Sequence, residues 1–164
     1  MKEKERAIKK QNKEPSVTII IPTHSAPIDT VVAALKKQKY TGKVTIIALD
    51  NGDRDRSSQM PKGITYIKNE RNFGLAGSLN KGILLAKTDH VITLHQDCVP
   101  VGVSWLSDLM KPFADPHVVL SSSQQQLPTE IWNQFSFWHK VFAVPELSLQ
   151  KTIHERATAY TTSV

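Results

Sequence analysis

Runs of β-branched residues alternate with segments of helical spacing, and this alternation limits the fold more than any other feature. The run Val17-Thr-Ile-Ile-Ile21 predicts a strand buried on both faces, and the apolar spacing over residues 28–39 predicts a helix. Further strands are predicted at 44–49, 64–67, 91–94 and 118–120, and a further helix at 105–113. The apolar positions Leu75, Leu79, Ile83 and Ala86 predict another helix over 75–87. Strands that alternate with helices pair in parallel through right-handed crossovers. The sequence therefore predicts an α/β fold with a mainly parallel central sheet and helices on both faces.

Length and composition fit one ordinary globular domain. The chain has 164 residues, of which 40% are hydrophobic and 22% charged. Cys98 is the only cysteine, so no internal disulfide can form and a reducing compartment is expected. No run approaches the ~20 apolar residues that span a bilayer. We therefore predict a cytoplasmic location, with attachment to the inner face of the membrane as a second hypothesis.

The charge is concentrated at the amino end. Residues 1–14 carry six Lys or Arg and three Glu, a net +3 within the total of +6. We expect this basic leader to be flexible and solvated, with attraction to an anionic membrane surface as the alternative. The other charges form no basic stripe, so nucleic acid is not an expected partner. Residues 15–128 are predicted to form the main domain, and residues 129–164 a helical, aromatic segment.

Two predicted strands end in polar turns that fall on the same rim of the sheet. Pro22, Thr23 and His24 end the first, and Asp50 and Asn51 end the second. Ligands of parallel sheets bind outside the carboxyl ends of the strands. A carboxylate at Asp50 could accept the N–H of a pyrimidine base there. Alternatively, Asp50 only initiates a turn, and the sequence leaves both interpretations open.

The stretch from Arg71 to Gly82, Arg-Asn-Phe-Gly-Leu-Ala-Gly-Ser-Leu-Asn-Lys-Gly, places glycines and amides at the start of a helix. Gly74 is expected to take a positive φ, and the following helix would direct its N-terminus at the rim, where anions bind. The amides of Asn72 and Asn80 could then contact ribose or phosphate. Close helix–sheet packing is the favoured explanation for Gly77 and Gly82.

The segment His95-Gln96-Asp97 follows the fourth strand. A carboxylate at that position could hold a divalent cation that bridges two phosphates, and imidazole suits Mn²⁺ better than Mg²⁺. Asp97 could instead cap a helix near Ser104, and His95 could be an ordinary strand residue. No Gly-x-Gly-x-x-Gly follows the first strand, and no Gly-Lys-Ser/Thr loop occurs, which argues against dinucleotide and P-loop sites.

Four segments between Val17 and about Gln125 resemble, in order and spacing, the inverting glycosyltransferases of family 2, which have the GT-A fold. They are Val17-Thr-Ile-Ile-Ile-Pro-Thr-His24, Ile46-Ile-Ala-Leu-Asp-Asn-Gly52, the stretch from Arg71 to Gly82, and Leu94-His-Gln-Asp-Cys-Val-Pro100. The last occupies the position of the family's Asp-x-Asp metal motif. Its Gln-Asp core is similar to that of the rhamnosyltransferase-like branch.

This resemblance implies that residues 15–128 bind a UDP-, GDP- or dTDP-sugar and that residues 129–164 begin the acceptor side. It implies transfer to a saccharide or lipid-linked acceptor in cell-surface polysaccharide synthesis, with Mn²⁺ or Mg²⁺ as cofactor. In this family pattern Asp50 contacts the base. Asp97 is the direct metal ligand, and His95 is a second candidate. The residues expected at the donor are Pro22, Thr23, His24, Asp50, Asn51, Asn72, Gly74, Asn80 and Gln96.

Two departures from the family pattern matter. His95 replaces the first acidic residue of the metal motif, and members of the family continue beyond this region with the part that supplies the catalytic base. The catalytic residue is therefore unassigned. Two alternatives remain: a non-catalytic nucleotide-binding module, and a fragment that pairs with a further domain or a second copy. The surface for such pairing would be the aromatic side chains Trp132, Phe135, Phe137, Trp138 and Phe142.

Overall fold

The computed structural model describes residues 14–123, 129–138 and 159–161. The chain divides into two compact units, Met1–Trp105 and Leu106–Val164. All of the predicted leader except Glu14 lies outside the described residues. The predicted boundary at residue 128 remains a prediction.

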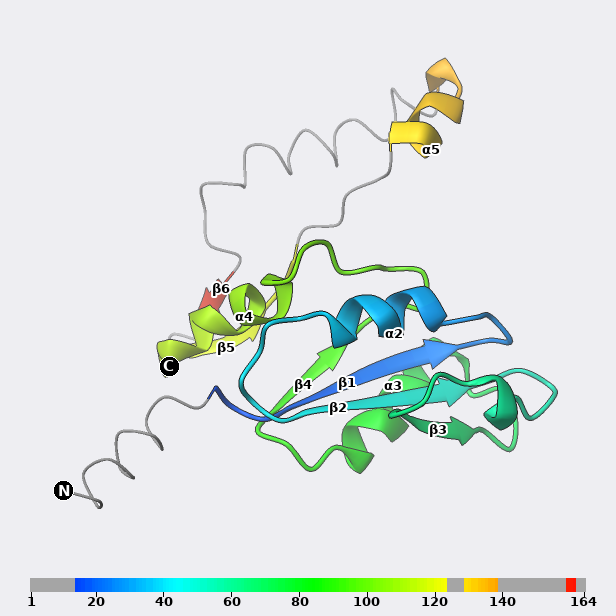
Figure 1. The fold of residues 1–164 in the computed structure, drawn as a ribbon, viewed down its shortest axis with the longest axis horizontal. Helices are drawn as coiled ribbons and strands as arrows, with labels where there is room; N and C mark the ends of the chain where they lie inside the picture. Colours follow the sequence, from blue (N-terminus) through cyan, green and yellow to red (C-terminus); the bar gives the residue numbers. More distant parts are fainter. Residues whose placement is uncertain (1–13, 124–128, 139–158, 162–164) are drawn as a thin grey trace. The chain divides into compact units, whose positions relative to one another are not determined.

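The first unit is built on a four-stranded sheet (Figure 1). Its strands are β1 (Val17–Thr23), β2 (Val44–Asp50), β3 (Thr65–Lys68) and β4 (His90–Thr93). Their order in the sheet is β3-β2-β1-β4, and every neighbouring pair runs parallel. The predicted α/β class with a parallel central sheet is confirmed.

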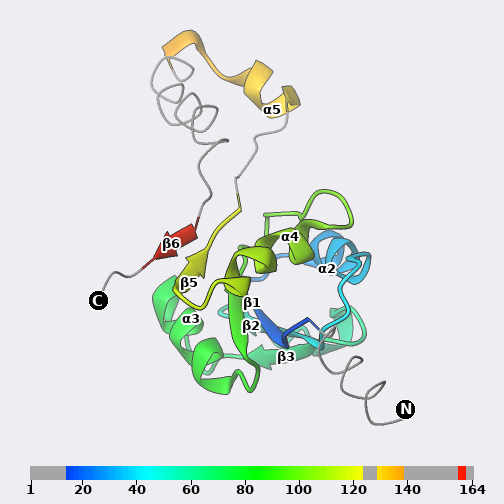
Figure 2. The same ribbon diagram turned by 90° about the vertical axis from the view of Figure 1, so that its left-hand side faces the viewer.

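Two helices cover this sheet, and the order of the strands shows where a ligand crevice belongs. Figure 2 shows α2 (Asp29–Lys36) and α3 (Gly74–Leu85) on opposite faces of the sheet. The chain first builds outward from β1 through β2 to β3, and α3 then carries it to β4 on the other side of β1. The direction of winding reverses between β1 and β4, and ligands of open α/β sheets bind at such a reversal.

The core lies around β1, which is buried along its whole length as predicted. On one face, Ile20, Ile47 and Leu49 form a cluster against which Ile67 and Leu79 pack. The apolar stripe predicted for α2 is also confirmed: all four of its side chains, Ile28, Val31, Val32 and Leu35, are buried. The burial of these aliphatic side chains holds the sheet rigid behind its carboxyl rim.

Helix α3 turns a different face to the sheet from the one predicted. Leu75 and Ile83, expected in its buried stripe, are 49% and 47% exposed, and the helix instead buries Ser78 and Gly82. Gly82 allows a close approach, because a Cβ there would lie 2.5 Å from Cγ2 of Ile20. The explanation by helix–sheet packing is confirmed for Gly82 and wrong for Gly77, where a Cβ would lie 2.8 Å from Cβ of Phe73 and would meet no atom of the sheet within 4 Å. The predicted apolar stripe is wrong at two positions.

The later elements are α4 (Trp105–Met110), a 3₁₀ turn at Lys111–Ala114, β5 (Val118–Ser121), α5 (Thr129–Gln134) and β6 (Ala159–Thr161). Strand β5 pairs antiparallel with β6. These two strands form a separate two-stranded sheet, outside the parallel central sheet. Among the described residues, no helix has the length and apolar character needed to cross a membrane.

The aromatic residues predicted for a pairing surface do not all lie on helix α5. Helix α5 ends at Gln134, and Ser136 stands just beyond it, a residue type that competes for backbone hydrogen bonds and favours helix ends. Phe137 and Trp138 contact each other edge to face, with ring centroids 5.4 Å apart, and both are exposed. Phe142 lies outside the described residues.

Candidate functional site

A hydrogen bond joins the two sides of the strand reversal. The His24 N–H, just beyond β1, donates to Oε1 of Gln96, just beyond β4, at 3.0 Å. Cys98 N–H donates to the His95 carbonyl at 3.1 Å and closes the turn that carries Gln96 and Asp97. The carboxylate-bearing turn is therefore fixed beside the end of β1, with Asp97 and His95 both exposed.

Asp50, the last residue of β2, holds the adjacent loops in place. Its Oδ1 accepts from the N–H groups of Ser25 at 3.1 Å and Gly52 at 2.8 Å, and its Oδ2 accepts from the Tyr66 hydroxyl at 2.9 Å. Burial by itself would raise the pKa of Asp50, but these hydrogen bonds and the charge of Arg56 keep the pKa below its usual value. The carboxylate is therefore ionised and fully buried among protein donors. A contact to a base remains a prediction.

Asn51 fastens the start of α3 to the end of β2. Its Oδ1 accepts from Asn69 Nδ2 at 2.9 Å, Ser78 Oγ at 3.1 Å and Phe73 N–H at 3.2 Å. Its Nδ2 donates to the Gly74 carbonyl at 3.2 Å. Both ends of this amide are occupied within the protein, so the Asn51 side chain fixes the loop that was predicted to meet the donor. Direct contact of Asn51 with the donor remains a prediction.

Asn69 extends this network to a cation. Its Nδ2 also donates to Ser78 Oγ at 3.1 Å, and its Oδ1 accepts from Lys81 Nζ at 2.8 Å. The Lys81 ammonium lies 5.7 Å from the ring centroid of Phe73, and the Arg71 guanidinium lies 5.1 Å from it. Two positive charges therefore stand beside the loop that leads into α3, within cation–π range of one aromatic ring.

The backbone at the start of α3 takes the predicted form. Gly74 has a φ of +67°, which confirms the expected positive φ. Asn72 Oδ1 accepts the Gly74 N–H at 2.8 Å, an Asx turn that shapes the entry to the helix. Both residues are exposed. A side chain at residue 74 would meet nothing within 4 Å, so the backbone there is open to approach.

The remaining predicted donor residues fall in different environments. Pro22 and Thr23 are buried inside β1, and His24 is exposed at its end. Asn80 is exposed on α3, two residues beyond buried Ser78 and so on another side of the helix. Whether these four residues contact a donor remains a prediction.

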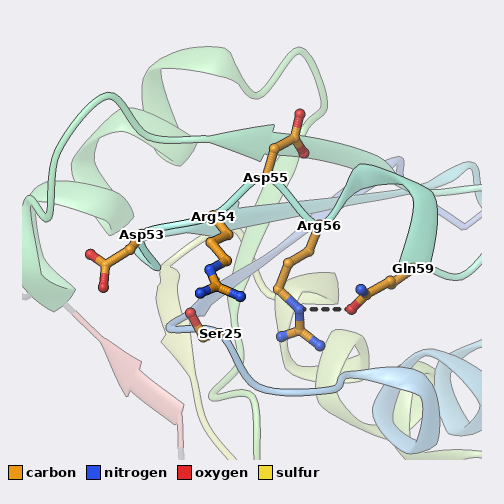
Figure 3. A pocket seen from close by; sticks show the side chains of 6 residues that line it. All are labelled: Ser25, Asp53, Arg54, Asp55, Arg56 and Gln59. Carbon is orange, nitrogen blue, oxygen red and sulfur yellow. Dashed lines mark hydrogen bonds between the residues drawn. The ribbon is translucent and has the colours of Figure 1, made fainter.

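A pocket of about 320 Å³ opens beside the Asp50 turn (Figure 3). Its lining residues come from the loops after β1 and β2: Ser25, Asp53, Arg54, Asp55, Arg56 and Gln59. Arg56 Nε donates to Gln59 Oε1 at 3.1 Å, which holds the guanidinium against the wall. The lining is strongly polar and carries charges of both signs.

A complete metal site does not exist among the described residues, since no three His, Cys, Asp or Glu side chains come together. A Mg²⁺-like ion needs only one or two carboxylates when the phosphates of a substrate supply other ligands. Exposed Asp97 fits that requirement. Burial and the neighbouring Asp97 carboxylate raise the pKa of the Cys98 thiol, which favours its neutral form.

Sequence reasoning missed Tyr66, Asn69 and Ser78, which connect the predicted residues. One signal was present: Asn69 follows β3 as Asn51 follows β2, so two neighbouring strands end in amides on one rim. The contacts of Tyr66 and Ser78 depend on how β3 and α3 pack, which the residue pattern did not show.

Hydrogen bonds thus connect the ends of β4, β1 and β2 to the start of α3. A parallel sheet with polar loops gathered at its point of reversal is the arrangement in which open α/β proteins bind their ligands. Residues 18–160 match Glycosyl transferase family 2, and the chain belongs to that family.

Two relatives illustrate the similarity. The catalytic subunit of a UDP-forming cellulose synthase from Xanthomonas axonopodis pv. citri is 34% identical over 93 residues, which cover 52% of this chain and 13% of the relative. An uncharacterized glycosyltransferase from Methanocaldococcus jannaschii is 28% identical over 94 residues, which cover 51% of this chain and 32% of the relative. The chain thus matches less than a third of one relative and about a third of the other.

Proposed function

We propose that this chain is the donor-binding part of a glycosyltransferase that moves a sugar from a nucleotide diphosphate sugar to an acceptor hydroxyl, with inversion and with the help of a divalent cation. The observation that carries the proposal is the hydrogen bond from His24 N–H to Gln96 Oε1. It fixes the turn containing Asp97 at the reversal point of the sheet, where the phosphates of a nucleotide are expected.

The charges around this point suit a nucleotide diphosphate. Arg71 and Lys81 offer cations beside the start of α3, and the Gly74 backbone is open to approach. Asp97 would hold the divalent cation, which when bound would offset the negative charge that develops on the departing diphosphate. His95 is a second candidate ligand, and Mn²⁺ would tolerate it better than Mg²⁺.

The similarity to a UDP-forming cellulose synthase makes UDP the first nucleotide to test and cell-surface polysaccharide the expected product. GDP and dTDP remain candidates, and the rhamnosyltransferase-like assignment rests on the Gln96-Asp97 core alone. We place the protein in the cytoplasm, with association at the inner membrane surface and self-association as further hypotheses. The acceptor, saccharide or lipid-linked, and the catalytic base are unassigned.

Calorimetry with UDP, GDP and dTDP, each with and without Mn²⁺, tests the proposal. We expect one nucleotide to bind more tightly with Mn²⁺, and Asp97→Ala to abolish that metal-dependent gain. Asp89→Ala is the matched control, because Asp89 lies just before β4, at the opposite end of that strand from Asp97, and accepts hydrogen bonds from Ser16 there. This control should keep the full metal effect.

Absence of binding to all three nucleotides would refute the proposal, and a metal effect that survives Asp97→Ala would refute the assignment of the ligand. Donor hydrolysis or sugar transfer, measured on the same protein, separates the remaining alternatives. Nucleotide binding without any turnover would favour a non-catalytic binding module.

A further inference from the structure

The hydroxyl group of Tyr66 links two parts of the rim that are distant in sequence. It donates to Asp50 Oδ2 at 2.9 Å and accepts from the backbone N–H of Arg56 at 3.1 Å. Asp50 ends β2, whereas Arg56 belongs to the loop that lines the pocket. One side chain of β3 therefore ties this loop to the end of β2.

The same carboxylate also holds a second residue that lines the pocket. Asp50 Oδ1 accepts from Ser25 N–H, and Ser25 lines the pocket together with Arg56 (Figure 3). Ser25 has a φ of +54°, and it is the only non-glycine residue with a positive φ among those described. A strained backbone of this kind persists only where the surrounding contacts fix it.

One nitrogen of the Arg56 guanidinium makes no hydrogen bond to the residues that the structure describes. Nη1 of Arg56 is buried and has no hydrogen-bond partner within the described part of the chain, although Nε of the same guanidinium is bonded to Gln59. A buried guanidinium nitrogen without a partner costs free energy. Arg56 lines the pocket, so a bound ligand that brings its own acceptors could relieve this cost.

We propose that Tyr66 is a positioning residue for the donor nucleotide: it does not contact the nucleotide, but through Asp50 it fixes the lining residues Ser25 and Arg56 relative to each other. This inference rests on the proposed function, since it assumes that a nucleotide binds beside the Asp50 turn. It assigns to β3, an edge strand without a predicted site residue, control over nucleotide affinity.

The test compares Tyr66→Phe with Tyr40→Phe. Tyr40 provides a matched control, because its hydroxyl donates to the Pro15 carbonyl at 2.6 Å near the amino end of β1, at the opposite end of the strands from the carboxyl rim. Each substitution removes one hydroxyl and leaves the ring. We expect Tyr66→Phe to weaken UDP binding, measured by calorimetry with Mn²⁺, by about fivefold to tenfold, the worth of one net hydrogen bond. Tyr40→Phe should bind UDP as the unaltered chain does.

A second variant guards against a folding defect in the first. Gly52→Ala would place a Cβ 2.0 Å from Ser25 Oγ and 3.1 Å from Asp50 Oδ1, so it disturbs the same contacts without touching Tyr66. It should also weaken UDP binding, with circular dichroism showing that the protein remains folded. Equal affinity in the unaltered chain, Tyr66→Phe and Gly52→Ala would overturn the positioning role and leave the proposed function standing. No nucleotide binding by the unaltered chain would overturn both.

Discussion

Replacing Asn69 by alanine should destabilise the protein more than the loss of an ordinary polar residue. The side chain is fully buried, and its Nδ2 donates to Asn51 Oδ1 and Ser78 Oγ while its Oδ1 accepts from Lys81. Two neutral hydrogen bonds at ~1 kcal/mol each and one bond to a charged group at up to ~2 kcal/mol are removed. Because Asn51 keeps its other donors and Lys81 can reach water, we expect a total loss of about 2–4 kcal/mol.

Urea unfolding followed by circular dichroism measures this loss as a shift in midpoint at constant slope. Asn80→Ala is the control, since Asn80 is an exposed asparagine on the helix that the network anchors. Its effect should stay within ~0.5 kcal/mol. A loss below about 1 kcal/mol for Asn69→Ala, or equal losses for both variants, would show that the network does not secure the start of α3.

Two further predictions concern packing and pH. Gly82→Ala should destabilise the chain by about 1–3 kcal/mol in the same unfolding assay despite the better helix propensity of alanine, because the new Cβ would lie 2.5 Å from Ile20 Cγ2; an increase in stability would refute the close approach. The folded-state pKa of Asp50 lies below its unfolded value, so its contribution to stability is present above about pH 4 and is lost as pH falls through the folded pKa. Asp50→Asn should therefore flatten the acid limb of the stability profile. The flattening should be partial, because hydrogen bonds from Ser16 also lower the pKa of Asp89, which keeps its own contribution. An unchanged acid limb would contradict this account.

The sheet could be predicted from the sequence because its signal is local. Each strand of the first unit is a short β-branched or apolar run, and burial of β1 on both faces follows directly from Val17-Thr-Ile-Ile-Ile21. The face of α3 could not be predicted in the same way. Apolar periodicity pointed to Leu75 and Ile83, whereas the helix buries Ser78 and Gly82, and at Gly82 the sheet approaches too closely for a larger residue.

In the candidate site, too, the features with a local sequence signal could be predicted, and those that depend on packing could not. Polar turns after parallel strands predicted the rim, and the glycine at position 74 predicted the positive φ found there. The roles within the rim depend on three-dimensional contacts. The Asp50 carboxylate accepts hydrogen bonds within the protein, the Asn51 amide both accepts and donates, and Tyr66 and Asn69 complete these networks. Residue type and spacing identify which groups reach a rim, but hydrogen-bond partners decide which of them remain open to a ligand.

This distinction bears on the cation that we propose for the site. Gln96 Oε1 accepts the His24 N–H, so the side chain before Asp97 serves to hold β1 and β4 together. Among the described residues Asp97 belongs to no group of three or more His, Cys, Asp or Glu side chains that could hold a metal ion. One or two carboxylates bind a hard divalent cation weakly, so the phosphates of the donor would have to supply further ligands. Linkage then requires that the nucleotide raise the affinity for the metal by the same factor as the metal raises the affinity for the nucleotide. The replacement of the first acidic residue of the motif by His95 would thus make cation binding depend on the donor more strongly than a site with two carboxylates would.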